Sequence, residues 1–470
     1  MLESLKCRSN GSLQDALQLI NSNAKRLAFV VEEDATLIGV LTDGDIRRLL
    51  LEGITLDASV AVHANQNCVK AYQHESLQEM LAKISDRVTV LPILNDEGKL
   101  VDFFQYENRV HIPVAAPDLK GNEFKYLVDA FLSTWISSSG SYINKFEEGF
   151  AEFCECEHGV AVSNGTVALH LALVALGVGP GDEVIIPDLT FAATINAVIH
   201  AGATPIIVDV EMESWCIDPL EIKKAITDKT KAIIPVHLYG QPCNMSAIMA
   251  IANQHNLFVI EDCAEAHGAT FEGQKVGSFG HISTFSFYGN KVITTGEGGM
   301  CVTNSEQLDK RMRVLRDHGM SKEKRYWHEE VGFNYRMTNL QAAIGVAQLE
   351  RIDEILSFRA SIEAKYVEML SGYDFIKFQP KIKGRNRIVW LVSVLVDGTD
   401  RDELISKLKE VKIDARPFFY SMGEMPIYSE YVFSNKNSLK LAAAGVSFPT
   451  SSEITEAVSE RITRVFSLVK

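Results

Sequence analysis

The segment Leu257-Phe258-Val259-Ile260-Glu261-Asp262 is a short apolar run that ends in two acidic residues. Similar runs precede it at residues 183–186, 204–209 and 232–236, and they alternate with segments of helical pattern. Short, nearly continuous apolar runs are typical of strands that are buried on both faces of a sheet. From residue 117 onward the sequence therefore predicts an α/β fold with a mainly parallel sheet and helices on both faces.

The sequence changes character near residue 340. Residues 340–349 are a strong helix-forming run, and fewer strand-like runs follow them. We therefore expect a smaller α+β domain at the C-terminal end. A length of 470 residues favours about three domains. We place them at residues 1–112, 113–345 and 346–470.

The first domain contains two rough copies of one pattern, in which a helix, a strand, a turn and a second strand follow one another. These elements are expected at 12–20, 26–31, 32–35 and 37–42, with a further helix from Asp43, and again at 76–81, 89–94, 95–98 and 100–104. Duplicated small α/β units usually stack on each other. We therefore expect a paired module.

The composition excludes some partners. Acidic residues outnumber basic ones by 61 to 46, which gives a formal net charge of −15. A field of this sign repels phosphate backbones and anionic lipids, so we expect no nucleic-acid or membrane partner, although a local pocket for one phosphorylated ligand is compatible with it. Residues 1–6 lack a signal-peptide pattern, and no apolar segment reaches the ~18 residues of a membrane helix. We expect a cytoplasmic protein.

The cysteines give no metal-binding pattern. Eight cysteines are scattered without CxxC pairs, and the segment Cys154-Glu155-Cys156 has few neighbouring His or Cys residues. This spacing indicates reduced, mostly buried thiols and no metal site.

A candidate anion site lies at residues 163–166, Ser-Asn-Gly-Thr, which join an apolar run at 160–162 to a helix-forming run at 167–173. A turn of small residues at a helix N-terminus presents unpaired N–H groups and the positive end of the helix dipole. Gly165 and Thr166 are therefore candidate phosphate contacts. An ordinary helix start is the alternative.

Two titratable residues stand out. Asp262 should project from the C-terminal edge of the sheet, where open α/β sheets bind their ligands. A carboxylate there can hold a proton on a ring nitrogen, or it can cap a helix or stay solvated.

Lys291 is the one lysine among the small and apolar residues of 283–300. Desolvation lowers the pKa of an ammonium group and favours the nucleophilic amine, which suits Schiff-base chemistry. Ser286 offers a hydroxyl group to a phosphate, and the glycines at 296, 298 and 299 would let the backbone approach a ligand closely.

Five segments, taken in order, resemble the DegT/DnrJ/EryC1/StrS family. They are residues 163–166, 188–194, 261–269, 283–300 and 332–343. The family consists of sugar aminotransferases that have the aspartate-aminotransferase fold (fold type I) and use pyridoxal 5′-phosphate (PLP). The resemblance covers about residues 117–470. It implies a large PLP-binding domain with a mainly parallel sheet, followed by a small α+β domain.

The resemblance also implies a role for each matching residue of the cofactor site. Lys291 matches the lysine that binds the aldehyde of the cofactor, and Asp262 matches the acid that pairs with its ring nitrogen. The remaining contacts implied are Gly165, Thr166 and Ser286 to the phosphate, and Phe191 stacked on the ring opposite Ala264. A core position is the alternative for Phe191.

Two further matches are informative. Asn334 matches an asparagine that reaches the phosphate of the partner subunit's cofactor, which implies a homodimer or a higher homo-oligomer with shared active sites. Glu265 departs from the commonest pattern, which has glutamine or histidine near the phenolic oxygen of the cofactor. An ionised glutamate cannot donate a hydrogen bond. Glu265 would therefore have to be protonated or turn toward water.

The substrate is implied by softer signals. The segments 135–138, 215–219, 264–268, 316–320 and 325–328 resemble the subgroup that makes GDP-perosamine. The implied reaction moves the amino group of L-glutamate to the 4-keto carbon of a nucleotide-linked 6-deoxysugar, GDP-4-keto-6-deoxymannose, for surface polysaccharide (O-antigen) synthesis. Because Lys291 is present, transamination is favoured over the dehydration catalysed by relatives with histidine there. The alternatives are a UDP- or dTDP-linked sugar, a 3-keto sugar, another keto-sugar acid, or a nucleotide sensor with vestigial catalysis.

The duplicated N-terminal segment resembles a tandem cystathionine-β-synthase (CBS) module, a pair-forming fold that often binds adenine nucleotides. The resemblance rests on residues 37–48, in which Thr42 and Asp45 match positions that contact ribose and phosphate. The second copy has Asp-Phe-Phe-Gln at 102–105, without the matching hydroxyl and acid. At most one site for an adenine or guanine nucleotide is therefore expected. A structural or oligomerising role is the alternative.

Overall fold

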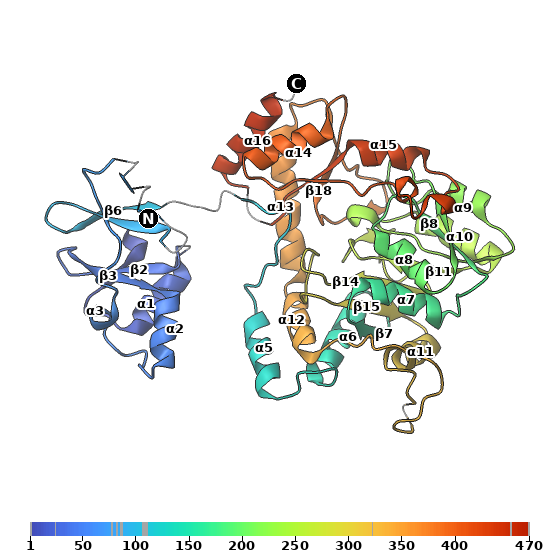
Figure 1. Cartoon of the computed structure of the whole chain (residues 1–470), viewed down its shortest axis with the longest axis horizontal. Coiled ribbons are helices and arrows are strands. Elements are labelled where there is room, and N and C mark those ends of the chain that lie inside the picture. The colour runs from blue at the N-terminus through green and yellow to red at the C-terminus, as the bar shows by residue number, and fades with distance from the viewer. Residues whose placement is uncertain are drawn as a thin grey trace. The chain divides into compact units, whose positions relative to one another are not determined.

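The computed structural model describes residues 2–23, 25–76, 79–80, 83–84, 88–105, 111–321, 323–451 and 454–468. The chain divides into two compact units, Met1–Val110 and His111–Lys470. Their elements are labelled in Figure 1.

The N-terminal unit contains two three-stranded sheets of the same design. One has the order β1-β2-β3 (Lys6–Arg8, Leu27–Val31, Leu37–Thr42), and the other has the order β4-β5-β6 (Ala71–Tyr72, Val90–Leu94, Leu100–Gln105). In each sheet the first pair of strands is parallel and the second pair is antiparallel. This repetition confirms the duplication predicted from the sequence.

Helices and a shared core complete this unit. Its helical elements are η1 (Leu2–Leu5), α1 (Leu13–Ser22), α2 (Asp43–Leu51) and α3 (Val60–His63). Of the helix predicted at 76–81, residues 77–78 and 81 lie outside the described residues. Leu27, Phe29 and Val31 of the first sheet pack in one cluster with Val90 and Leu94 of the second. Apolar burial therefore joins the two copies.

The large sheet of the second unit has seven strands in the order β7-β15-β14-β11-β10-β8-β9. These strands are His158–Val162 (β7), Glu183–Pro187 (β8), Thr204–Val208 (β9), Thr230–Ile233 (β10), Phe258–Asp262 (β11), Ile282–Ser286 (β14) and Gly299–Thr303 (β15). The pairs from β14 to β9 are parallel, whereas β15 is antiparallel to both β14 and β7. The predicted mainly parallel sheet is thus confirmed.

Helices cover both faces of this sheet. They are Glu123–Leu132 (α5), Ser141–Phe153 (α6), Gly165–Ala175 (α7), Ala192–His200 (α8), Pro219–Ala225 (α9), Met245–His255 (α10), Glu306–Arg316 (α11) and Asn339–Leu349 (α12). Alternate strand residues enter different cores. Ile185 and Val259 belong to one apolar cluster, and Ile186 and Ile260 belong to the other. Burial on both faces explains why the strands are continuous apolar runs.

The C-terminal part is built around a small antiparallel sheet with the order β16-β18-β20-β19 (Ile376–Phe378, Val392–Val396, Gly445–Phe448, Arg416–Pro417). Its helices are α13 (Ile352–Leu370), α14 (Arg401–Glu410), α15 (Lys436–Ala444) and α16 (Glu456–Leu468). In Figure 1, α13 runs from α12 toward α14 and α16. This is the expected α+β composition.

Short elements connect these parts: β12 (Thr270–Phe271), β13 (Gln274–Lys275), β17 (Arg385–Asn386), η2 (Leu238–Gly240), η3 (Met422–Glu424) and η4 (Ser429–Tyr431). The expected boundary between residues 345 and 346 falls inside α12, which packs against α5 and α6 of the large domain. Since a helix seldom divides between two cores, we propose that the boundary follows α12.

Two other predictions can be compared with the structure. All eight cysteines are free thiols, and all except the half-buried Cys68 are buried, as expected. Among the described residues, no helix is both long and apolar enough to cross a membrane.

Candidate active site

A cavity of about 620 Å³ opens at the carboxyl ends of the parallel strands. Most of the sequence-predicted site residues line it: Gly165, Thr166, Phe191, Asp262, Ala264, Glu265, Ser286 and Lys291. Residues of the C-terminal part, Trp390 and Phe419, line it as well. Ligands of open α/β sheets bind at this edge, because the loops that follow the strands meet there. Segments far apart in the sequence therefore converge on one site.

Lys291 lies in the connection from β14 to β15, which contains no helix and returns the chain directly to the neighbouring antiparallel strand. Its Nζ is 3.8 Å from Oε1 of Glu265 and 4.2 Å from the centre of the Trp390 ring. Burial lowers the pKa of Lys291, while the charges of Glu265 and Asp262 oppose this shift. The lowered pKa favours the neutral amine that the sequence predicted.

Asp262 ends β11 and is only 5% exposed. Its Oδ2 accepts a hydrogen bond from Oγ1 of Thr194 (2.8 Å), and its Oδ1 accepts one from the N–H of Ala264 (3.2 Å). Burial raises the pKa of Asp262, and the bond from Thr194 opposes this. Asp262 begins no described helix. The two alternatives, a helix cap or a solvated acid, are therefore wrong.

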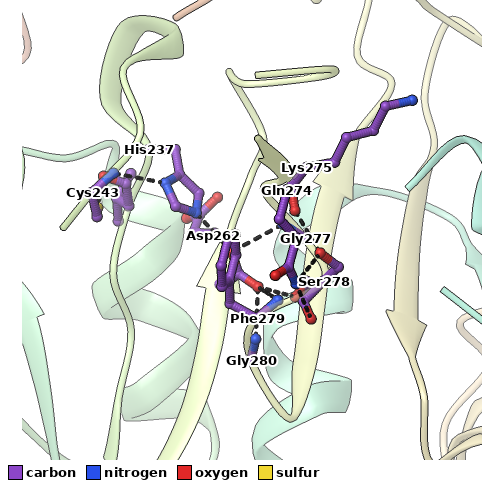
Figure 2. Close-up of polar contacts among 12 residues, drawn as sticks. His237, Cys243, Asp262, Gln274, Lys275, Gly277, Ser278, Phe279 and Gly280 are labelled. Carbon is purple, nitrogen blue, oxygen red and sulfur yellow. Dashed lines mark hydrogen bonds and ion pairs between the residues drawn. The ribbon is translucent and has the colours of Figure 1, made fainter. Parts of the chain in front are cut away.

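The neighbouring Glu261 explains how the end of β11 is held. Its buried carboxylate accepts hydrogen bonds from His237 Nε2 (3.0 Å), from Oγ of Ser283 (3.0 Å), and from the N–H groups of Gly277, Phe279 and Gly280 (2.9, 2.8 and 2.7 Å). Figure 2 shows His237 and the 277–280 loop on opposite sides of β11. Burial would raise the pKa of Glu261, but these donors outweigh it and lower that pKa. The network fixes the strand from which Asp262 projects.

This network also bears on metal binding. Ligand atoms of His237, Glu261 and Cys263 lie within 4.8 Å of one another. However, Nδ1 of His237 accepts the N–H of Cys243 (3.1 Å), so its Nε2 carries the proton that Glu261 accepts. The nitrogen that faces the carboxylate is thus a donor and has no lone pair to offer a metal ion.

Glu265 is 4% exposed, and its Oε2 accepts the N–H of Tyr239 (2.9 Å). Burial raises its pKa to about 7, with Lys291 opposing the shift. Of the two options that the sequence left open, the turn toward water is therefore excluded. Glu265 can carry a proton at neutral pH.

Gly165 and Thr166 form the first turn of α7, and the Asn164 side chain caps this helix by accepting the N–H of Val167 (3.0 Å). A Cβ atom at Gly165 would come within 2.8 Å of the Cβ of Ser286. Only glycine therefore allows the helix N-terminus and the Ser286 hydroxyl to lie side by side. This cradle combines N–H donors, a hydroxyl group and the positive helix end, which is suited to a phosphate.

Phe191 precedes α8 and is 58% exposed. Its ring lies 5.7 Å from that of Phe419 at the cavity wall. The core alternative for Phe191 is therefore wrong.

Asn334, in contrast, does not line this cavity. It is exposed, and its Oδ1 accepts a hydrogen bond from Nε of Arg336 (3.0 Å).

Thr42 and Asp45 lie in the N-terminal unit, at the start of α2. Oγ1 of Thr42 accepts the N–H of Asp45 (3.2 Å), while Oδ2 of Asp45 accepts the N–H and the hydroxyl of Thr42 (3.0 and 2.7 Å). This reciprocal arrangement is a capping box. Ser12 and Asp15 form the same box at α1. The geometry thus gives both pairs a role in helix capping.

Three residues that line the cavity or bind its residues were not predicted. Thr194 lies in the segment 188–194 that was quoted for its aromatic residue, so its hydroxyl could have been noticed. Trp390 lies in the apolar run 388–396, where it resembles a core residue. Arg359 contacts the backbone of Lys291 from α13, and no local pattern connects the two positions.

The fold and the site together define a class of protein, the PLP-dependent aminotransferases of the aspartate-aminotransferase fold. The model of the DegT/DnrJ/EryC1/StrS aminotransferase family matches residues 117–469, so the chain belongs to this family. The model of the CBS domain matches residues 3–52, which contain the first of the two copies.

Similar proteins include the GDP-perosamine synthases of Caulobacter vibrioides (49% identical, 75% of this chain and 96% of that protein) and Escherichia coli O157:H7 (46%, 76% and 99%). Similar structures include an aminotransferase from Psychrobacter cryohalolentis, with a TM-score of 0.69 and 32% identity over 75% of this chain and 97% of that one. The PLP-form of the putative sugar aminotransferase Spr1654 from Streptococcus pneumoniae has a TM-score of 0.72 and 26% identity, over 77% and 100% of the two chains.

The residues present fit the cofactor. A buried carboxylate at Asp262 suits a protonated ring nitrogen, and a buried amine at Lys291 suits an aldehyde. The glycine cradle at Gly165 leaves space for a phosphate beside Ser286. An aldehyde, a ring nitrogen and a phosphate are the polar groups by which this cofactor is held.

The raised pKa of Glu265 predicts a pH-dependent stability. Because the folded-state pKa is about 7 and the ordinary value is 4.5, the folded protein holds this proton more tightly than the unfolded chain. Stability from this group is therefore complete below about pH 4.5 and is lost as the pH rises to about 7. We expect Glu265→Gln to stabilise the cofactor-free protein more at pH 8 than at pH 5, by on the order of 3 kcal/mol.

Urea unfolding followed by tryptophan fluorescence at both pH values measures this difference. The exposed Glu213→Gln is the control, because Glu213 does not line the cavity. An equal effect of Glu265→Gln at pH 5 and pH 8 would contradict the assignment.

Proposed function

We propose that the enzyme transfers the amino group of L-glutamate to the 4-keto carbon of GDP-4-keto-6-deoxymannose and so makes GDP-perosamine for O-antigen synthesis. The observation that supports this substrate is the identity of 46% to 49% with proteins named GDP-perosamine synthase, over almost their whole length. A vestigial sensor is not favoured, because lysine and aspartate are both retained in one buried cavity. A cytoplasmic location stays a prediction from the sequence.

The roles of the residues follow from their positions. PLP, when bound, supplies an aldehyde carbon that takes up an amino group and a protonated ring that acts as an electron sink. We assign Asp262 to the ring nitrogen, whose proton its carboxylate holds in place. We assign Gly165, Thr166 and Ser286 to the phosphate, and Phe191 and Ala264 to the two faces of the ring.

Lys291 acts twice in this proposal. Its amine would hold the cofactor at the aldehyde carbon, and when free it would take a proton from the α-carbon of glutamate or return one to it. The second half-reaction runs the same transfer in reverse toward the sugar. A lowered pKa suits both tasks, since an ammonium group is neither a nucleophile nor a base. Glu265, which lies 3.8 Å away, can exchange a proton with this amine.

We further propose a homodimer in which Asn334 reaches the cofactor phosphate of the other subunit. Asn334 is exposed and does not line the cavity of its own chain. The nearby Tyr326, Trp327 and Val331 are 74%, 55% and 89% exposed, which is unusual for large apolar side chains of an isolated subunit. A partner subunit would cover them.

The sequence and the CBS match also support a nucleotide site in the N-terminal unit. The match covers residues 3–52 and therefore includes Thr42 and Asp45. We propose that an adenine or guanine nucleotide contacts these two side chains at the N-terminus of α2.

A panel of keto sugars tests the substrate. With glutamate and PLP, the purified protein should aminate GDP-4-keto-6-deoxymannose with a kcat/KM at least about tenfold above that for UDP- or dTDP-linked 4-keto or 3-keto sugars, a difference of about 1.4 kcal/mol. Lys291→Ala should lose an absorbance band at about 400 to 430 nm and at least about 10³-fold in kcat. Lys275→Ala is the control, since Lys275 does not line the cavity. In the panel of keto sugars, a higher kcat/KM for a sugar linked to another nucleotide would overturn the substrate assignment.

Mixing two inactive variants tests the shared site. If Lys291 and Asn334 act across the dimer, Lys291→Ala and Asn334→Ala are each inactive or weak. Random exchange of subunits should restore about a quarter of the wild-type activity, because half of the dimers are mixed and one of their two sites is intact. The activity after refolding or prolonged mixing measures this. Activity that stays at the mean of the two separate variants would contradict a shared site.

Matched substitutions separate nucleotide binding from capping. Thr42→Ala and Ser12→Ala should each cost about 0.5 to 2 kcal/mol in stability, because each removes one helix cap. A nucleotide at 100 times its Kd should stabilise the wild type by about 2.7 kcal/mol, and thus raise the melting temperature. We expect this rise to persist in Ser12→Ala and to be lost in Thr42→Ala. If ATP and GTP change neither the melting temperature nor the activity of the wild type, the module is structural.

A further inference from the structure

Arg359 is a buried guanidinium that the proposed reaction does not use. It lies on α13 and is 4% exposed. Its NH1 donates to the carbonyl of Trp390 (2.6 Å) and to Oγ1 of Thr450 (2.9 Å), and its NH2 donates to the carbonyl of Lys291 (3.2 Å). Its described hydrogen-bond partners are thus neutral oxygens, and one of them belongs to the lysine at the centre of the site.

This arrangement is costly for a structural residue. Burial lowers the pKa of Arg359 to about 10, and the charge of Asp118 opposes this only in part. A buried charge without a bound carboxylate is generally less stable than an apolar side chain of similar volume. Arg387 is the contrasting case, because its guanidinium binds the carboxylate of Glu363 (2.8 and 2.9 Å). The difference calls for a function at Arg359 beyond packing.

Trp390 binds the segment that carries Lys291 at the residue before the lysine, Asn290. Its indole Nε1 donates to the carbonyl of Asn290 (2.8 Å), and its ring lies 4.2 Å below Nζ of Lys291. Its own carbonyl accepts from Arg359 and from Thr450 (3.0 Å). Two successive carbonyls of the lysine segment therefore accept hydrogen bonds from two side chains of the C-terminal part, and the Arg359 side chain also binds the backbone carbonyl of Trp390.

We propose that Arg359 and Trp390 are positioning residues for Lys291, which they hold through the carbonyls of Lys291 and Asn290. This inference rests on the proposed function, in which the same lysine must bind a carbon atom and later move a proton at that atom. The segment that carries Lys291 contains no helix, so its backbone has no regular ladder of hydrogen bonds to define its position. The two donors supply that definition. A misplacement of about 1 Å at such a site can cost on the order of 10²-fold in rate.

Three substitutions in the full-length holoenzyme test the proposal. Arg359→Met removes the guanidinium, Arg359→Lys retains the charge, and Trp390→Phe removes the Nε1 donor while keeping an aromatic face. We expect Arg359→Met to lower kcat about 10- to 100-fold with less than about a threefold change in the KM for glutamate. We expect a partial recovery in Arg359→Lys and a fall of about fivefold or more in Trp390→Phe.

The absorbance of the PLP-loaded enzyme without substrate supplies an independent readout. If Arg359 and Trp390 set the position of Nζ of Lys291, the pH midpoint of the 400 to 430 nm band should shift in Arg359→Met and in Trp390→Phe. It should not shift in Arg387→Met, because Arg387 is a partly buried arginine that binds Glu363 and has no described contact with the lysine. This titration requires no sugar or glutamate. It can therefore distinguish a wrong substrate assignment from a wrong positioning role for Arg359 and Trp390.

Unchanged midpoints and kcat values within about twofold of the wild type, in folded Arg359→Met or Trp390→Phe, would overturn the proposal. The same conclusion follows if Arg387→Met lowers kcat and shifts the band as much as Arg359→Met does. If Arg359→Met does not fold, Trp390→Phe decides the question, because it removes a single donor and leaves the core aromatic.

Discussion

The active site depends on keeping one ammonium group and two carboxyl groups close together and out of water. Lys291, Asp262 and Glu265 are each buried. The charge of Lys291 lowers the pKa of both carboxyl groups, and the charges of both carboxyl groups raise the pKa of Lys291. Desolvation disfavours the charged form of every member, whereas the opposite charges favour it. The balance leaves a lysine with a lowered pKa and a glutamate whose pKa is near neutrality. Such groups can pass a proton at little cost in free energy, which is what an exchange of amino groups requires.

The topology of the sheet provides this balance. Asp262 is placed by a parallel strand whose neighbouring residue, Glu261, is locked by five donors, so the aspartate cannot retreat toward solvent. Lys291 lies in the connection between β14 and β15. These two strands are antiparallel neighbours, and the connection between them contains no helix. A parallel connection usually passes through a helix that packs on a face of the sheet, and it would carry the lysine to that face. The break in the parallel pattern is thus tied to the chemistry.

The sequence revealed those parts of this arrangement that are local. Apolar runs predicted β8 to β11, and the small residues around Gly165 predicted an anion cradle, because burial on both faces and unpaired N–H groups are properties of short segments. The setting of Lys291 was inferred from its apolar neighbours for the same reason. The contacts of Arg359, Trp390 and Thr194 with the site were missed, because they join positions that lie 31 to 100 residues apart. The shortest separation is that of Arg359 and Trp390 (31), and the longest is that of Trp390 and Asn290 (100). The burial of Phe191 was left open because an aromatic residue before a helix has the same pattern in a core and at a cavity wall.

The N-terminal unit shows a related ambiguity between structure and binding. Ser12 with Asp15, Thr42 with Asp45, and Ser76 with Glu79 all exchange the same reciprocal hydrogen bonds. A hydroxyl residue followed three positions later by an acid is therefore, in this unit, first a device that starts helices. What distinguishes Thr42 is its place as the last residue of the antiparallel strand β3, whereas the last residue of β6 in the second copy, Gln105, has no hydroxyl group. The side chains of Thr42 and Asp45 already hydrogen-bond each other's N–H groups at the start of α2. A bound nucleotide would have to use the same side-chain atoms. Binding and capping then compete for the same atoms, and ligand affinity and helix stability in this unit become coupled quantities.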